Sequence, residues 1–339
     1  MKNKKLIWQL PFLALLIIGT ILIIRQQRSV PYQKNRGLVF GTTYTLTYQC
    51  DSDLIDGISE ELERVDMSLS PFNKNSIISA VNNNKDVELD EFFIYVFNKA
   101  KEISENTDGA FDITVAPLVN AWGFGFKSGT FPDERQVDSL KKIVGYRKCE
   151  LKDGKVVKQS PNMMFDCSAI AKGFGSDVIA NYLRRHGVKN FMVEIGGEIV
   201  TSGINEKRIP WQIGVTKPTE DPIGTHGSEL MTILNVTDKA MATSGNYRNF
   251  YYQGGKKFAH TIDPITGYPV QHSLLSATVI ADDCATADAY ATSFMVMGID
   301  KAKVFLDKHP ELMAYFIYSD EKGSLAVWFS PSLKEKIVE

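Results

Sequence analysis

Two oxygen-bearing side chains lie four residues apart, Asp288 and Thr292, in the segment TADAYATSFMVMG at residues 286–298. In a helix, positions i and i+4 share one face, so these two oxygens would converge. Most other residues of the segment are apolar, and a buried carboxylate among them needs a partner. A carboxylate and a hydroxyl suit a hard cation such as Mg²⁺. The alternative is a solvated face with Asp288 on the outside, which periodicity alone favours.

A second segment with chemical potential is DCSAIAKGFGSD, residues 166–177, which joins an expected strand end to a helix over residues 168–187. The start of a helix attracts phosphate through its free N–H groups and its dipole, and Lys172 adds positive charge there. The spacing is not that of a Walker loop. Close helix packing is an equally good reason for the glycines.

His260 lies in an expected strand, KKFAHTI at residues 256–262, on the same face as Phe258 and Ile262. Such a position is typical of a histidine in the core. The following sequence, DPITGYP, predicts a sharp turn that would bring the strand end beside a loop. A histidine there can accept a proton near neutral pH, which makes His260 a candidate base.

The elements that must position these residues follow from hydrophobic periodicity and turn residues. They alternate between helices and strands without a clear repeat or interdomain linker, which predicts an α+β fold with largely antiparallel sheets and packed helices. A glycine-rich loop carries Trp122, Phe124 and Phe126 and could hold a planar ligand or form its own small core. Residues 26–37 are expected to be a polar linker. Helices are expected over 53–67, 91–106, 168–187, 286–298 and 300–308, strands over 37–50, 191–195, 277–281, 313–319 and 324–330, and hairpins at Asp153-Gly154 and Gly254-Gly255.

The composition restricts the class of protein. The chain has 339 residues, 44% of them hydrophobic, so it can bury a large core. The formal charge of −2 and the lack of a basic stripe with aromatics argue against a nucleic-acid partner. The four cysteines have no CxxC spacing and are expected to be free thiols, Cys50, Cys149, Cys167 and Cys284.

The N-terminus has the pattern of a membrane anchor, residues 1–28, ahead of one domain over residues 29–339. Three lysines precede a mostly apolar run from Leu6 to Ile24, which at ~1.5 Å per residue just reaches across a bilayer. No small-residue cleavage site follows, so the anchor is expected to be retained. The lysines would stay cytoplasmic and the rest would be exported.

Seven stretches together resemble the ApbE family of FAD:protein FMN transferases. They occur in the family's order and cover about residues 37–329. The stretches are GTTYTLTY, SPFNKNSIIS, GAFDITVAPLVNAWGFG, DCSAIAKGFGSD, VEIGGEIVTSG, ATSGNYRNFYYQGGKKFAHTIDPITGYPV and ATADAYATSFMVMG. The last two of these are specific to the family. The resemblance implies a T-fold-like core. The N-terminal anchor predicts a location at the bacterial inner membrane, with the catalytic domain facing the periplasm or the cell exterior.

The resemblance also implies roles for single residues. Asp288, Thr292 and the main-chain carbonyl of Ala169 would bind Mg²⁺, and His260 would be the base. Phe40 stands where the family usually has methionine, and Phe72 where it usually has tyrosine. The positions that match contacts to the flavin dinucleotide are Phe40, Phe72, Trp122, Gly123, Phe124, Asp166, Lys172 and Ile262.

The reaction implied is attack by a threonine or serine hydroxyl of an acceptor protein on the FMN-side phosphorus of FAD, with AMP leaving. The acceptor would carry a sequence like Asp-Gly-x-Ser/Thr-Gly-Ala-Thr/Ser, which this chain lacks. Two other activities fit the same residues. An FAD pyrophosphatase would let water attack, and a non-catalytic flavin-binding protein would use the aromatics but not the metal.

Overall fold

The computed structural model describes residues 11–20, 30–125, 131–218, 229–246, 250–253 and 256–338. The predicted anchor, Leu6–Ile24, lies partly outside these ranges. Its described part, residues 11–20, is helical. Within the described ranges, no helix has both the length and the apolar character needed to cross a bilayer.

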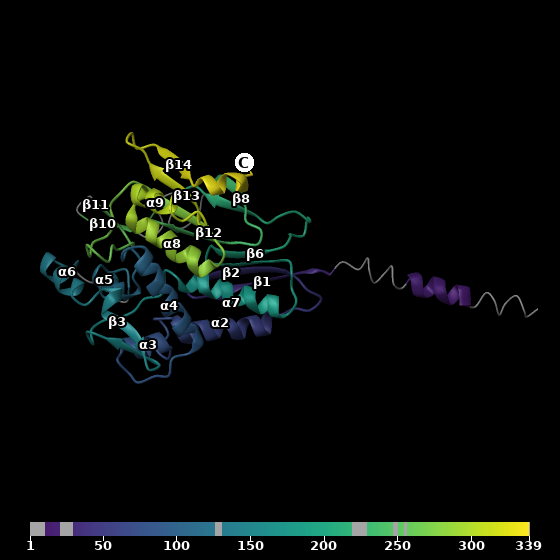
Figure 1. The fold of residues 1–339 in the computed structure, drawn as a ribbon, viewed down its shortest axis with the longest axis horizontal. Coiled ribbons are helices and arrows are strands. Elements are labelled where there is room, and N and C mark those ends of the chain that lie inside the picture. Colours follow the sequence, from purple (N-terminus) through teal and green to yellow (C-terminus); the bar gives the residue numbers. More distant parts are fainter. Residues whose placement is uncertain are drawn as a thin grey trace, which may run out of the picture.

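The main sheet has eight strands in the order β1-β2-β5-β6-β9-β12-β13-β14, and each neighbouring pair is antiparallel (Figure 1). The predicted α+β class with a largely antiparallel sheet is therefore confirmed. The strands are β1 (Tyr32–Val39), β2 (Thr42–Gln49), β5 (Phe191–Ile195), β6 (Glu198–Ser202), β9 (Ala240–Gly245), β12 (Leu274–Ala281), β13 (Met313–Ser319) and β14 (Leu325–Phe329).

Three two-stranded sheets and a set of helices surround the main sheet. The small sheets pair β3 (Cys149–Lys152) with β4 (Lys155–Lys158), β7 (Gln212–Thr216) with β8 (Leu230–Asn235), and β10 (Phe250–Gln253) with β11 (Lys256–Ala259). The α-helices are α2 (Ile55–Leu69), α3 (Ile77–Asn82), α4 (Glu91–Asn106), α5 (Ala116–Ala121), α6 (Glu134–Lys141), α7 (Ala171–Arg185), α8 (Cys284–Met297) and α9 (Ile299–Leu306). The 3₁₀ helices are η1 (Ile113–Val115), η2 (Tyr146–Lys148) and η3 (Pro331–Lys336).

Helices α7 and α8 cover one face of the sheet, α7 over β5 and β6 and α8 over β9 and β12 (Figure 1). Helices α2 and α4 form a further layer against them. Strands β7, β8 and helix η3 cover the opposite face, where Ile213, Leu234 and Leu333 pack with side chains of the main sheet. The central sheet is thus buried on both sides.

Helix α8 is buried on nearly all sides, because small alanines let it pack against the sheet while Phe294 and Met295 fill the space around it. Its N-terminus is capped twice. The side chain of Asp283 accepts from the Thr286 amide at 2.8 Å, and Asp177 of α7 accepts from the amides of Cys284 and Ala285, also at 2.8 Å. These bonds satisfy three of the N–H groups that a helix start leaves open.

A glycine sets the distance between α7 and α8. A Cβ atom at Gly173 would lie 2.3 Å from the carbonyl oxygen of Cys284 and 2.9 Å from Cβ of Asp288. Both neighbours belong to α8, and neither is the end of a flexible side chain. The packing interpretation of this glycine is therefore confirmed, and it brings the start of α7 directly against Asp288.

Most predicted elements hold, but four need correction, and the expected Gly254-Gly255 connection lies outside the described residues. The single strand expected over residues 37–50 is the end of β1 followed by β2, because Phe40 and Gly41 form a turn with positive φ between them. Residues 32–37 are not linker but the first part of β1, whose alternating half-buried side chains pair with β2. Helix α7 begins at Ala171 and not at residue 168, because Ser168 turns back to bond Asp166. Strand β11 ends at Ala259, so His260 lies just beyond the strand. The helix over residues 91–106, the hairpin at Asp153-Gly154 and the four free thiols are confirmed.

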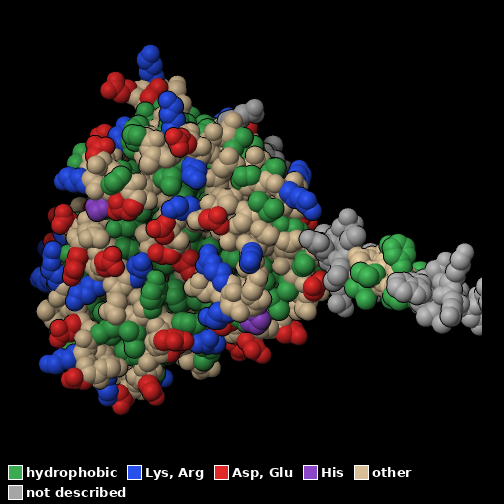
Figure 2. Space-filling view, turned by 45° about the vertical axis from the view of Figure 1, so that its right-hand side comes forward, with side chains coloured by type: hydrophobic (Ala, Val, Ile, Leu, Met, Phe, Trp, Pro, Cys, Tyr) green, Lys and Arg blue, Asp and Glu red, His purple; other side chains and the backbone are tan. Residues whose placement is uncertain are grey.

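The surface carries charges of both signs. On the face seen in Figure 2, Lys and Arg side chains are interspersed with Asp and Glu side chains over the described residues. Neighbouring charges of opposite sign cancel one another's field, so this face would exert little long-range attraction on a highly charged partner.

The close contact of α7 with α8 generates a prediction. Gly173→Ala should lower the free energy of unfolding by about 1–3 kcal/mol, because the two helices must move apart. Gly214→Ala in β7 is the control, since its Cβ would meet Cδ2 of Leu230, the end of a flexible and exposed side chain. Urea denaturation of both variants measures the difference. Equal stabilities would show that the helix contact is not tight.

Candidate active site

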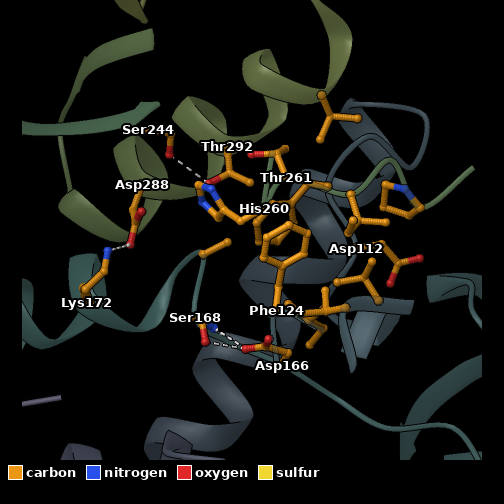
Figure 3. Close-up of a pocket in the computed structure, with 18 of the residues that line it drawn as sticks. Asp112, Phe124, Asp166, Ser168, Lys172, Ser244, His260, Thr261, Asp288 and Thr292 are labelled. Atoms are coloured by element: carbon orange, nitrogen blue, oxygen red, sulfur yellow. Dashed lines mark hydrogen bonds and ion pairs between the residues drawn. The ribbon is translucent and has the colours of Figure 1, made fainter. Parts of the chain in front are cut away.

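A cavity of about 400 Å³ lies where the start of α7, the middle of α8 and the end of β9 meet the segment after β11 (Figure 3). In the view of Figure 3, Asp288 and Lys172 lie at the left, His260 and Phe124 at the centre, and Asp166 with Ser168 below. The predicted site residues that line this cavity are Phe124, Asp166, Ala169, Lys172, His260, Ile262, Asp288 and Thr292.

Asp288 is buried, with 2% of its surface exposed, so the solvated alternative is wrong. The Gly173 amide donates to its Oδ2 at 3.1 Å, and Nζ of Lys172 lies 3.9 Å from the same oxygen. Lys172 itself donates a 2.7 Å hydrogen bond to Oε1 of Glu198. Two buried carboxylates therefore share one ammonium group at the cavity wall.

Burial controls the acid–base behaviour of this trio. It raises the pKa of Glu198 to about 8, helped by the charge of Asp288 and opposed by Lys172. It also raises the pKa of Asp288, against the opposing effects of Lys172 and the Gly173 amide. The two carboxylates together keep the pKa of Lys172 above its usual range in spite of its own burial. Lys172 thus stays positively charged, while both carboxyls bind protons more readily than free ones.

The oxygens on this side of the cavity fit a hard cation. Asp288 supplies a carboxylate, Thr292 a hydroxyl and Ala169 a main-chain carbonyl, and all three residues line the cavity. The hydroxyls of Thr292 and Ser244 are hydrogen-bonded at 3.0 Å, which fixes the Thr292 rotamer. Buried oxygen donors with a net negative charge are the ligands that Mg²⁺ prefers. Among the described residues, no cluster of three His, Cys, Asp or Glu side chains competes as a metal site.

His260 lines the same cavity as these oxygens. Its ring makes an edge contact with Phe124, at 6.4 Å between ring centroids and 70° between planes. It follows β11 directly, and Ile262 then forms a bridge with Pro269 that closes the DPITGYP turn. The hairpin and turn thus carry His260 to the cavity without placing it in the main core.

Asp166 forms the lower edge of the cavity in Figure 3, and its carboxylate is held by a local turn. Oδ1 accepts from the Ser168 amide at 2.8 Å and from the Ser168 hydroxyl at 2.5 Å. The Asp166 amide donates to the carbonyl of Ile113 at 2.7 Å, which ties this loop to η1. The turn directs Ala169 and then Lys172 into the cavity.

The predicted aromatic contacts fall in three places. Phe40 and Phe72 line a second pocket of about 470 Å³, which shares Ser168 and Lys172 with the cavity. Phe124 lines the cavity itself. Trp122 lines neither the cavity nor the second pocket. Its indole N–H donates to the Gly267 carbonyl at 2.8 Å, and its ring packs in a small buried cluster. Gly123 takes a φ of 80° between these two aromatics.

Six polar residues that line the cavity were not predicted as site residues from the sequence: Asp112, Ser168, Glu198, Thr243, Ser244 and Thr261. Glu198 follows the Gly196-Gly197 turn at the start of β6, and only 3% of its surface is exposed. An acidic residue after two glycines and before the apolar run Ile199-Val200 could have drawn attention. Ser244 had no comparable signal, because it is one small residue in a strand of small residues.

Sequence comparison places the chain among flavin-transferring enzymes. A family profile described as "ApbE family" matches residues 40–316. The chain is 37% identical over 304 residues to the FAD:protein FMN transferase of Haemophilus influenzae, covering 85% of this chain and 86% of that protein. It is 34% identical over 296 residues to the enzyme of the same name from Vibrio cholerae, covering 84% and 87%.

Structural comparison agrees with this. The flavin transferase ApbE from Vibrio cholerae superposes with a TM-score of 0.81 at 33% identity, covering 90% of this chain and 100% of that chain. The ApbE protein from Thermotoga maritima superposes with a TM-score of 0.79 at 28% identity, covering 91% and 100%. Both similarities extend over nearly the whole chain.

The raised pKa of Glu198 predicts a pH effect on stability. Between about pH 5 and 8 the folded protein holds a proton on Glu198 that the unfolded chain releases, so the free energy of unfolding should fall as the pH rises. Glu198→Gln removes this contribution. Denaturation in EDTA across that range should therefore show the parent losing stability relative to the variant as the pH rises. A stability difference between parent and variant that does not change with pH would contradict the raised pKa of Glu198.

Proposed function

Because the chain belongs to the ApbE family, we propose that it transfers the FMN half of FAD to a threonine or serine hydroxyl of an acceptor protein and releases AMP. The observation that carries this proposal is the cavity of about 400 Å³, which Asp288, Thr292, Lys172 and His260 line together. Groups suited to a pyrophosphate and a group suited to a hydroxyl proton thus share one enclosed space.

FAD is long, and two connected pockets suit it. The cavity and the second pocket, about 400 and 470 Å³, meet at Ser168 and Lys172. The pyrophosphate in the middle of FAD would lie at this junction, where the Lys172 ammonium can offset its charge. The two ends of the dinucleotide would then occupy the separate pockets, with Phe124 on one side of the junction and Phe40 and Phe72 on the other.

Asp288, Thr292 and the carbonyl of Ala169 would hold Mg²⁺ beside this junction. The bound ion would supply charge neutralisation to the pyrophosphate and the leaving phosphate. Ser244 would keep the Thr292 hydroxyl oriented through their 3.0 Å hydrogen bond. The burial of Asp288 keeps bulk water from weakening these interactions.

His260 would act on the nucleophile. It takes the proton of the acceptor hydroxyl while that oxygen forms a bond to the FMN-side phosphorus. The bond from this phosphorus to the bridging oxygen breaks, and AMP leaves with that oxygen. A neutral imidazole suits the proton transfer near pH 7.

The acceptor would be an exported or membrane redox protein that carries an Asp-Gly-x-Ser/Thr-Gly-Ala-Thr/Ser sequence.

The first 28 residues would anchor the enzyme in the bacterial inner membrane, with the catalytic domain facing the periplasm or cell exterior. Membrane fractionation and a C-terminal reporter fusion test this location. A soluble mature form starting well beyond Ile24, or a cytoplasmic reporter signal, would contradict it.

Incubation of the purified domain with FAD, Mg²⁺ and an acceptor peptide of that sequence tests the proposed activity. Covalent flavin on the peptide together with free AMP supports the transferase. Free FMN and AMP without a labelled peptide would identify a pyrophosphatase. Intact FAD that stays bound would identify a flavin-binding protein.

The cation ligands generate one prediction. Asp288→Ala should abolish Mg²⁺-dependent transfer, because it removes the proposed carboxylate ligand of the cation, and EDTA should abolish transfer by the parent, because it removes the cation itself. Asp307→Ala, which removes an exposed carboxylate after α9, is the control and should retain activity. Full activity of Asp288→Ala, or of the parent in EDTA, would refute the metal assignment.

The proposed base generates another. His260→Asn should bind FAD about as tightly as the parent but transfer FMN about 10²- to 10⁴-fold more slowly, since a base acts in the transition state. The defect should shrink as the pH rises and the acceptor hydroxyl ionises more readily. His186→Asn, at an exposed histidine after α7, is the control. If FAD affinity and melting temperature fall together with the rate, His260 is a structural residue.

A further inference from the structure

The ammonium group of Lys172 lies between two buried carboxylates but is bonded to one of them. Its Nζ is 2.7 Å from Oε1 of Glu198 and 3.9 Å from Oδ2 of Asp288. The longer distance is beyond a hydrogen bond. Yet a small rotation of the lysine side chain would close it, because four flexible methylenes carry the ammonium.

We propose that Glu198 is a positioning residue that holds the Lys172 ammonium away from Asp288 and so keeps the Asp288 carboxylate open to a divalent cation. This inference rests on the cation site of the proposed function. It assigns a task to Glu198, which is not among the predicted Mg²⁺ ligands.

The physical reason is competition between two positive charges. A free ammonium beside a buried carboxylate would pair with it, because few waters remain there to solvate either charge. That ion pair would occupy the oxygen that the cation needs. A second carboxylate on the far side of Lys172 offers the ammonium a better partner and prevents this.

The backbone around Glu198 fixes it in this position. Glu198 is the first residue of β6 after the Gly196-Gly197 turn, where both glycines have positive φ. The Ser176 hydroxyl donates to the main-chain carbonyl of Glu198 at 3.1 Å. Ser176 lies one turn after Lys172 on α7. This hydrogen bond is therefore a second link between the helix that carries Lys172 and the strand that carries Glu198.

The other carboxylate oxygen of Glu198 separates this role from ordinary structural support. Oε2 is buried and has no hydrogen-bond partner among the described residues. Carboxylates that only stabilise a fold normally have both oxygens satisfied. Here one oxygen bonds Lys172, and the other borders the cavity wall at Gly196.

The test measures Mg²⁺ binding by calorimetry at about pH 8.5, above the pKa of about 8 of Glu198. Four proteins are compared: the parent, Glu198→Leu, Lys172→Met and the double variant. Glu198→Leu should bind Mg²⁺ at least about tenfold more weakly. Lys172→Met should bind at least as tightly as the parent. The double variant should return to within about threefold of the parent, because no ammonium remains to compete.

Rescue by the second substitution is what a merely structural glutamate would not show. If Glu198→Leu binds as the parent does, or if the double variant stays as weak as Glu198→Leu, the inference is overturned. Should Glu198→Leu not fold, Glu198→Gln takes its place in both the single and the double variant, because it removes the charge but keeps the shape of the side chain, and the same weakening and rescue are expected. If the parent binds no Mg²⁺, or if Asp288→Ala binds Mg²⁺ as the parent does, the cation site of the proposed function is overturned instead.

Discussion

The contact between helices α7 and α8 is the constraint on which the site depends. Because Gly173 has no side chain, the start of α7 approaches α8 closely enough for its amide to bond Asp288. The same approach brings Lys172 to the two buried carboxylates. A carboxylate in the middle of an alanine-rich, buried helix would be unfavourable without these partners. The packing of two helices and the chemistry of the cavity are therefore one arrangement, and neither can change alone.

Much of the fold could be predicted because its signals are local. Helix α4 has a regular apolar stripe, and the hairpin at Asp153-Gly154 has a two-residue turn that favours positive φ. Strand β1 was missed because its polar, half-exposed residues look like linker until β2 pairs with them. The burial of Asp288 could not be predicted either, since it depends on how α7 and the sheet enclose α8. Periodicity within one helix contains no such information.

The site residues, like the fold, could be predicted from the sequence only in part. Motif resemblance brought together residues from α7, α8, the loops after α5 and before α7, and the segment after β11, and eight of them do line one cavity. It did not separate the aromatics that face a pocket from Trp122, whose indole is bonded to Gly267 inside a small core. It also passed over Glu198, because a lone acidic residue after a glycine turn is common on protein surfaces. Only the folded chain shows that this carboxylate is buried against a lysine.

The histidine of the site is carried by the short β10–β11 hairpin and its following turn, outside the eight-stranded sheet. The oxygens and the ammonium, in contrast, belong to helices packed on that sheet. The two halves of the cavity therefore differ in how freely they can vary during evolution. If FAD binds as proposed, substitutions in the hairpin would change which nucleophile reaches its phosphorus and would leave the part of the cavity that holds the nucleotide intact. Descendants of one such scaffold could in this way diverge between modifying proteins and simple hydrolysis without rebuilding the core.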